Sequence, residues 1–178
     1  MIHPDTEIRF ISNEKGYGVV ATKLIPRGTI TWVQDDLDQI FTQTQAANLH
    51  PSIKKHLETY SFVNKNGEMV LCWDNAKFVN HSFRPSCFST PYDFEIAIRD
   101  IYPGEELTDD YGYLNVEKPF EVIDEGTSRK AVYPDDILTF HEEWDALIKE
   151  NAPKVLETEQ PLLPLIPKNT WNEFVNGV

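Results

Sequence analysis

Short apolar runs separated by turn signals fill the first two thirds of this chain of 178 residues, and they restrict its fold more than any other feature. Residues 7–11 and 94–99 alternate between apolar and polar side chains, and residues 19–22 and 29–33 are rich in β-branched side chains. Pro26-Arg27-Gly28 is a typical turn between the latter two runs. Alternation with a period of two indicates strands with one buried face. The sequence therefore predicts a β-rich domain of small sheets.

One hairpin is expected in the middle of this β-rich part. The apolar runs 60–63 and 69–73 flank Asn64-Lys65-Asn66-Gly67, which is a typical tight-turn sequence. The polar stretch 35–55 is expected to be a loop that contains one short helix near residues 44–50, which ends before Pro51.

The pattern changes to a helical period after Tyr113. Asp135 and Asp136 are suitable N-terminal caps for a helix over about 135–152, with Pro153 at or just beyond its end. Its apolar residues recur at helical spacing: Ile137, Leu138, Phe140, Trp144, Leu147 and Ile148. A tail rich in proline follows, with one more helical turn expected within 169–178. We therefore divide the chain into a domain over 1–115 and a C-terminal extension over 116–178.

The charge balance is strongly acidic, with 16 Lys and Arg against 29 Asp and Glu, or −13 with neutral histidine. A negative field repels phosphate backbones, which argues against direct contact with nucleic acid. It favours a cationic partner such as a Lys-rich protein, although the same charge could serve solubility alone.

The cellular compartment is predicted from features that the sequence lacks. Cys72 and Cys87 are too few for a disulfide scaffold and favour a reducing compartment. Residues 1–10 carry no apolar stretch typical of a signal peptide, and no apolar run reaches the ~20 residues that a membrane span needs. We expect a cytoplasmic location, or a nuclear one in a eukaryotic host, and no membrane partner.

Several motifs of common enzyme classes can be excluded. Gly16, Gly18 and Ala21, with Asp36 further on, match the letters of a dinucleotide fingerprint, but β-branched residues and Pro26 follow where the fingerprint needs a helix. These glycines then mark either a tight turn or a place where a ligand approaches the backbone. The sequence also lacks a nucleophile elbow, a phosphate-binding loop and a zinc-binding helix.

Two polar segments remain as candidates for a site. Asn80-His81-Ser82 follows the apolar residues Phe78 and Val79, and it fits either a buried hydrogen-bonded turn or a set of donors and acceptors for an adenine ring. The segment 105–113 contains four carboxylates and two phenols. It fits either a solvated edge or a site, although neighbouring side chains of a strand point to opposite faces.

The order and spacing of three motifs carry more information than each motif alone. Residues 15–19, then 78–82 followed by Pro85 and Cys87, then 98–112 closely resemble the SET-domain family of protein-lysine methyltransferases. The resemblance covers about residues 5–115. The remainder is similar to the C-terminal extension of small stand-alone SET proteins of the bacterial type. The resemblance implies a mainly β fold with some helix, a β-clip of small sheets with a pseudoknot, followed by a helical extension.

The resemblance also implies a function and a set of site residues. The expected reaction transfers a methyl group from S-adenosylmethionine to a lysine side chain of a basic protein, with Tyr111 as the catalytic residue. The implied cofactor-binding residues are Lys15, Gly16, Tyr17, Gly18, Asn80, His81 and Tyr111. The implied substrate channel contains Tyr113, Asp109 and Tyr60. Trp32 and Phe41 are further candidates for its wall, and each of these aromatic side chains could equally belong to the core.

The chain departs from the family pattern at two places. Many relatives bind zinc through cysteines after the catalytic tyrosine, whereas this chain has no cysteine beyond Cys87. Val122, Asp124, Glu125 and Ser128 occupy that stretch. We therefore expect no zinc or other metal, and expect Phe120 and the C-terminal helix to help close the site. Asp109 stands where the family often has Phe or Tyr, which leaves the number of transferred methyl groups open.

Two other functions remain open at this point. Asp109 and the missing cysteines would also fit a catalytically weak or inactive SET module that binds cofactor or protein. The apolar residues between Leu162 and Pro167 could dock a partner or a second copy of the chain, which would give a homodimer through the extension.

Overall fold

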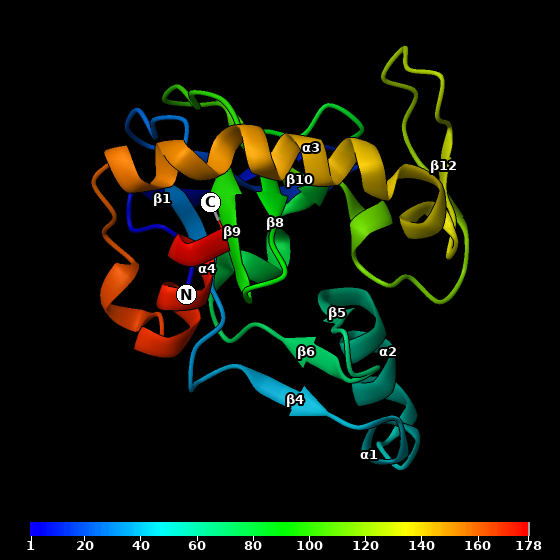
Figure 1. Cartoon of the computed structure of the whole chain (residues 1–178). Helices are drawn as coiled ribbons and strands as arrows, with labels where there is room; N and C mark the ends of the chain where they lie inside the picture. Colours follow the sequence, from blue (N-terminus) through cyan, green and yellow to red (C-terminus); the bar gives the residue numbers. More distant parts are fainter. Residues whose placement is uncertain (178) are drawn as a thin grey trace.

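The computed structural model describes residues 1–177 and arranges their strands in small sheets rather than one large sheet. In Figure 1 the long helix α3 (Asp136–Glu157) crosses above the strands, and a smaller lobe around β4 and β6 lies below them. None of the helices in this range is both long and apolar enough to cross a membrane.

The first sheet brings two distant sequence motifs together. Its order is β1-β2-β10-β7, where β1 (Thr6–Ser12) and β2 (Gly16–Ala21) form a hairpin. Strand β10 (Glu106–Asp109) pairs with β2 on one side and, in parallel, with β7 (Asn80–His81) on the other. The segment that leads into Tyr111 therefore lies beside Asn80 and His81.

The second sheet forms the centre of the core. It has the order β3-β9-β8, with β3 (Ile30–Val33), β9 (Phe94–Ala97) and β8 (Cys87–Ser89). All four residues of β9 are buried, so both faces of this strand are covered. One cluster packs β3 and β9 against the extension through Ala152, Val155 and Phe174.

The third sheet belongs to the lower lobe and has the order β4-β6-β5, with β4 (Gln39–Phe41), β6 (Met69–Leu71) and β5 (Ser61–Val63). The predicted hairpin is confirmed by the antiparallel pairing of β5 with β6. The prediction of a loop over residues 35–55 with one short helix is partly wrong. The short helix is present as α1 (Gln43–Ala47), but a second helix, α2 (Pro51–Tyr60), follows it.

The start of α2 has a local cause. Pro51 occupies the first helical turn, where the missing N–H costs nothing and the fixed φ suits a helix. The Nδ1 atom of His50 accepts a hydrogen bond from the backbone N–H of Ser52 at 3.3 Å. Leu57 is the one buried residue of this helix. The helix therefore lacks the repeated apolar positions by which an amphipathic helix is recognised in a sequence.

The C-terminal part is more helical than expected. Helix α3 continues through Pro153 to Glu157. A proline inside a helix costs about 3 kcal/mol, and here the apolar contacts of Ala152 and Val155 with the core hold the last turns in place. The tail contains the short 3-10 helix η3 (Leu163–Leu165) and the helix α4 (Lys168–Gly177) instead of one extended segment and a single turn. Residue 178 lies outside the described residues.

These elements confirm the predicted fold class, a β-rich domain of small sheets with a helical C-terminal part. The strand pair β11 (Phe120–Glu121) and β12 (Ala131–Val132) connects this domain to α3. The proposed boundary between residues 115 and 116 stays a prediction.

Candidate active site

A small cleft of about 230 Å³ lies beside β7 and next to the tip of the first hairpin. It is lined by Glu14, Lys15, Asn80, His81, Tyr111, Glu121, Val122, Ile123 and Glu125. Of the residues expected to hold a cofactor, Lys15, Asn80, His81 and Tyr111 therefore meet in one place. Tyr17 is half exposed on β2, where its ring packs edge-on against Phe10.

The two glycines of the first motif have different roles. Gly16 has a φ of +76° at the hairpin end, a conformation that favours glycine. Gly18 lies within β2, where a Cβ atom would come within 2.4 Å of the Glu106 Oε1 atom and 2.9 Å of the Asn80 Nδ2 atom. Because Gly18 has no side chain, the side chains of Glu106 and Asn80 can occupy this space.

A hydrogen-bond network fixes Asn80 at the base of the cleft. Its Nδ2 atom donates to the Tyr17 carbonyl at 3.0 Å and to Glu106 Oε1 at 2.7 Å. Lys15 Nζ donates to the other oxygen of Glu106 at 3.1 Å. Asn80 and Lys15, which both line the cleft, are therefore held in set positions by Glu106.

His81 joins the two motifs that the parallel strands bring together. Its Nδ1 atom accepts a hydrogen bond from the backbone N–H of Tyr111 at 3.0 Å. Burial, with Arg129 and Lys15 adding to it, lowers the pKa of His81 to about 4, so the ring is neutral near pH 7. The ring proton must then lie on Nε2, which is buried and has no partner among the described residues. A ligand in the cleft could satisfy this donor.

Tyr111 is the residue that the small cleft shares with a second, larger pocket. Its hydroxyl donates a hydrogen bond to the Val79 carbonyl. Burial and the nearby Asp109 raise the pKa of Tyr111, so the phenol stays protonated. Because the proton points at Val79, the oxygen lone pairs remain available to accept a hydrogen bond.

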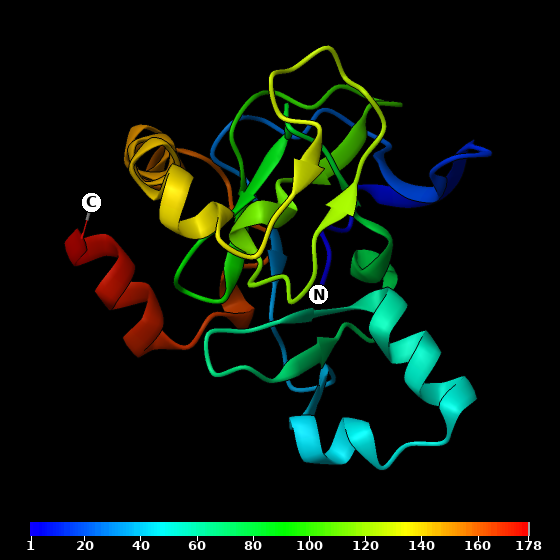
Figure 2. The same ribbon diagram turned by 90° about the vertical axis from the view of Figure 1, so that its right-hand side faces the viewer.

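The larger pocket, called the groove below, has a volume of about 640 Å³. It lies between the lower lobe, which contributes β5 and the end of α2, and the β8–β9 sheet with the segment after Tyr113 (Figure 2). Tyr60, Asp109 and Tyr113, the residues expected in a substrate channel, all line it, as does Trp32. Phe41 does not line it. Burial raises the pKa of Tyr113 to about 12.

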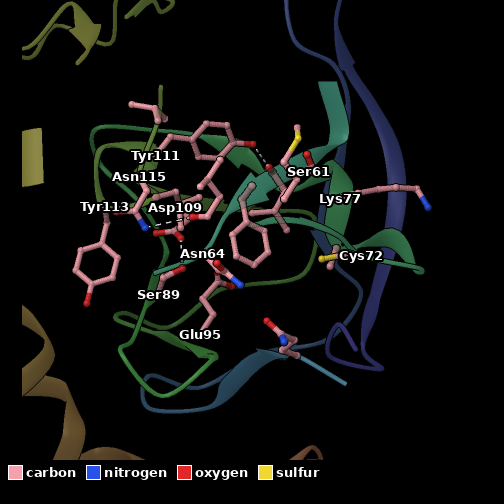
Figure 3. A pocket seen from close by; sticks show the side chains of 18 of the residues that line it. Ser61, Asn64, Cys72, Lys77, Ser89, Glu95, Asp109, Tyr111, Tyr113 and Asn115 are labelled. Atoms are coloured by element: carbon pink, nitrogen blue, oxygen red, sulfur yellow. Dashed lines mark hydrogen bonds between the residues drawn. The ribbon is translucent and has the colours of Figure 1, made fainter. Parts of the chain in front are cut away.

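Two buried carboxyl groups lie on one wall of the groove. Figure 3 shows Asp109, Ser89 and Glu95 following one another below the ring of Tyr111. Ser89 Oγ donates to Asp109 Oδ2 at 2.6 Å, and Thr31 Oγ1 donates to Glu95 Oε1 at 2.6 Å. Glu95 was missed in the sequence because it lies in an alternating strand, where a polar residue is expected to face solvent.

Arg129 is a second residue that the sequence did not reveal. Its guanidinium forms ion pairs with Asp110 and Asp136 and packs over the rings of Phe83 and Phe140 at 4.3 and 4.6 Å. Asp110 in turn accepts a hydrogen bond at 3.0 Å from the N–H of Gly112, in the 3-10 helix η2 (Tyr111–Tyr113). Arg129 therefore ties the segment of Tyr111 to the C-terminal extension.

Residues of the segment after Tyr113, at 121–125, line the small cleft, whereas Phe120, which was expected to help close the site, lines the groove. Glu125 Oε2 accepts hydrogen bonds from Ser82 Oγ and from the Phe83 N–H, both at 2.9 Å. The ring of Phe120 packs against His81 and Tyr111 at 6.1 and 6.2 Å between ring centres. Contacts of this chain alone thus hold the segment in place.

Metal independence stays a prediction. Among residues 1–177 no three His, Cys, Asp or Glu side chains are grouped as a metal site, and burial raises the pKa of both cysteine thiols, which disfavours the thiolate that zinc needs. We expect a strong chelator to leave the melting temperature and the activity unchanged. Elemental analysis checks this directly, and one zinc per chain would refute it.

The geometry limits the chemistry of the site. A half-buried tyrosine lines both a small cleft and a large, partly aromatic groove, and the neutral imidazole of His81 lines the cleft beside it. Such an arrangement can hold two different molecules from opposite sides and align them at one hydroxyl group. Tyr111 is therefore the centre of the candidate site.

Comparison with known proteins identifies the family. The SET domain model matches residues 16–112. Histone-lysine N-methyltransferase ASHH2 of Arabidopsis thaliana is 30% identical over 121 residues, covering 61% of this chain and 7% of that protein. Histone-lysine N-methyltransferase, H3 lysine-9 specific, of Schizosaccharomyces pombe is 31% identical over 121 residues, covering 57% of this chain and 24% of that protein. The similarity thus spans less than a quarter of each relative.

This chain belongs to the SET-domain family, and the resemblance inferred from its motifs is confirmed. The matched range includes Gly16, Asn80, His81, Asp109 and Tyr111, whereas the other residues that line the small cleft, at 14–15 and 121–125, lie outside it.

Proposed function

We propose that the protein is a lysine methyltransferase that transfers a methyl group from S-adenosylmethionine to a lysine side chain of a basic protein. The observation that carries the proposal is the place of Tyr111, which the small cleft and the groove share. The donor would bind in the cleft and the lysine would enter from the groove. Their reacting atoms would then meet at the hydroxyl group of Tyr111.

The small cleft fits the donor by its chemistry. The unpartnered Nε2–H of His81 and the fixed amide of Asn80 offer hydrogen bonds to a nucleoside, and the Lys15 ammonium can attract a carboxylate. Glu14 and Glu121 at the same cleft suit an ammonium or hydroxyl groups. When bound, S-adenosylmethionine supplies a methyl group on a positively charged sulfur.

The residues of this chain would prepare the acceptor. Tyr111 would accept an N–H of the substrate amine with its free lone pair, while its own hydroxyl proton stays on the phenol and donates to the Val79 carbonyl. The amine lone pair is then directed toward the cleft, attacks the methyl carbon, and the bond between carbon and sulfur breaks with its electrons left on sulfur. Alignment of this kind, rather than acid catalysis, would supply most of the rate.

The acceptor is proposed from charge and shape. The net charge of −13 and the carboxylates in the groove favour a Lys-rich segment over a nucleic acid. The relatives are named histone-lysine methyltransferases, which supports a basic protein as substrate class.

Calorimetry and a transfer assay test the proposal together. We expect S-adenosylmethionine to bind the wild type, and His81→Ala to weaken this binding by about tenfold through the lost hydrogen bond. Tritium from the labelled donor should reach lysine residues in a mixture of basic proteins.

The salt dependence of the reaction tests the role of the acidic surface. The KM for the protein substrate should rise between about 0.05 and 0.5 M salt, because the screening length of charge interactions shrinks to a few ångströms. A salt-independent KM would mean that the acidic surface serves solubility only.

The alternative function is a SET module that binds cofactor or protein without turnover. One observation favours it, because the buried Asp109 and Glu95 stabilise a charged ammonium over the neutral amine that methyl transfer needs. Tight binding of S-adenosylmethionine with no label transferred to any protein would support this alternative.

A further inference from the structure

The carboxyl groups of Glu95 and Asp109 carry charge in a place where charge is costly. The two residues are 5% and 2% exposed. Burial raises the pKa of Glu95 to about 6. Burial also raises the pKa of Asp109 well above its usual range, and the repulsion of Glu95 adds to this rise. Two carboxyl groups this close do not both ionise, so near neutral pH the pair holds one proton and one negative charge.

Among residues 1–177 no cation forms an ion pair with either carboxyl group. Of the lysines that line the same groove, Lys65 pairs with Asp93, Lys77 donates to the Trp73 carbonyl and Lys118 is exposed. The titratable groups that face the pair are the thiols of Cys72 and Cys87, the carboxyl group of Asp110, and the phenols of Tyr111 and Tyr113. None of these groups is a Lys, Arg or His, and the Arg129 guanidinium is paired with Asp110 and Asp136 instead. A buried charge without a counter-ion is destabilising unless a partner arrives from outside.

The groove offers a route for such a partner. Glu95 and Asp109 line it together with the aromatic side chains of Trp32, Tyr60 and Tyr113. Aromatic faces attract cations, and a carboxylate behind them adds a direct partner for the charge. The indole N–H of Trp32 is buried without a hydrogen-bond partner among the described residues. Its NMR shift should therefore change when a molecule enters the groove, which Trp32 lines.

We propose that Glu95 and Asp109, two buried carboxyl groups on one wall of the groove, act as one unit that binds the ammonium group of the incoming lysine and so selects a cationic side chain. This inference rests on the proposed function only in taking the groove as the substrate side, and it concerns binding rather than transfer. The two residues are specificity-determining, whereas Tyr111 is the catalytic residue.

The single charge of the pair makes an unusual prediction for variants. In Asp109→Asn the charge remains on Glu95. Glu95→Gln removes the repulsion that Glu95 adds to the raised pKa of Asp109, while burial, the largest cause, remains. Asp109→Asn therefore keeps the preference for a cation, and Glu95→Gln keeps less of it. Only the double variant, Glu95→Gln with Asp109→Asn, removes the charge while it keeps the size of both side chains and their hydrogen bonds to Thr31 and Ser89.

The test compares two synthetic peptides that differ at one position, a lysine against a norleucine between small neutral residues. Binding is followed by the NMR shift of the Trp32 indole N–H, in the absence of any methyl donor. We expect the wild type and Asp109→Asn to prefer the lysine peptide by about tenfold at pH 8, which corresponds to about 1.4 kcal/mol, and Glu95→Gln to show a smaller preference. The double variant should bind the two peptides within about twofold of each other.

A matched control removes two other acids of the same groove. Asp93→Asn with Glu117→Gln replaces two other acids that line the groove, which removes two negative charges against one for the pair, and we expect it to keep the lysine preference. A wild type without preference, a double variant that retains it, or a control that loses it would each overturn the proposal.

A pH series on the wild type keeps the proposal testable if the double variant does not fold. The lysine preference should disappear between pH 8 and pH 5, because the pair takes up its second proton near pH 6, whereas exposed carboxyl groups ordinarily stay charged down to about pH 4. A preference that persists at pH 5 would contradict the pair's role. Because no methyl donor is present, this outcome is independent of whether the protein transfers methyl groups.

Discussion

Replacing Tyr111 with phenylalanine is expected to lower the rate of methyl transfer by about 10²–10³-fold, or about 2–4 kcal/mol in the barrier. The change removes the hydroxyl group that the cleft and the groove share and keeps the ring that packs against His81 and Phe120. Single-turnover transfer of a labelled methyl group measures this step without product release.

The same variant should barely affect the binding of S-adenosylmethionine. Its affinity should change by less than about tenfold, because Asn80, His81 and Lys15 provide the other contacts of the small cleft. Stability should fall by only about 1 kcal/mol for the lost hydrogen bond to Val79. Tyr102→Phe, at an exposed residue, is the matched control and should change neither quantity. A Tyr111→Phe protein with the wild-type rate would make Tyr111 a structural residue.

Replacing Arg129 with methionine is expected to cause the largest loss of stability, about 3–5 kcal/mol. Methionine keeps a long side chain against Phe83 and Phe140 but leaves the buried Asp110 and Asp136 without a cation. Thermal or denaturant unfolding measures the loss. Arg9→Met removes an exposed ion pair with Glu7 and should cost less than about 0.5 kcal/mol.

The Arg129 variant also tests a positioning role for this residue. Asp110 accepts the Gly112 N–H beside Tyr111, and a Cβ atom on Gly112 would come within 2.6 Å of the guanidinium. We therefore expect kcat to fall more than the affinity for S-adenosylmethionine, measured below the melting temperature of the variant. Arg129→Lys should recover only part of both losses, since an ammonium cannot bridge the two carboxylates as a guanidinium does. An unchanged kcat in folded Arg129→Met would leave Arg129 with a structural role alone.

The family and several residues of the candidate site could be predicted from the ordered motifs, because each motif is recognised from the local order and spacing of its residues. Asn80, His81 and Tyr111 could be named from the sequence, and the parallel pairing of β7 with β10 brings them together. Their contacts could not be predicted. The hydrogen bond from the Tyr111 N–H to His81 Nδ1, for example, depends on the pairing of two strands that lie almost thirty residues apart in the sequence.

Other features depend on tertiary contacts that no period reveals. Glu95 looked like the polar side of an alternating strand, but both faces of β9 are covered and the side chain is buried against Thr31 and Asp109. Arg129 lies in a polar segment without pattern, and its role comes from the aromatic rings of Phe83 and Phe140 around it. Pro153 was expected to end α3, and the core contacts of Ala152 and Val155 override that local signal.

The most direct test of the account is a single-turnover reaction with enzyme in excess over methyl-labelled S-adenosylmethionine and a Lys-rich protein as acceptor. The account predicts that the label moves to the ε-nitrogen of a lysine, as mass spectrometry of the acceptor would show, and that Tyr111→Phe slows this transfer while the donor stays bound. The contradicting result is that the wild type binds the donor, that His81→Ala binds it more weakly, and that no label reaches any lysine. The small cleft would then bind a cofactor without catalysis, and the proposed transferase activity would be wrong.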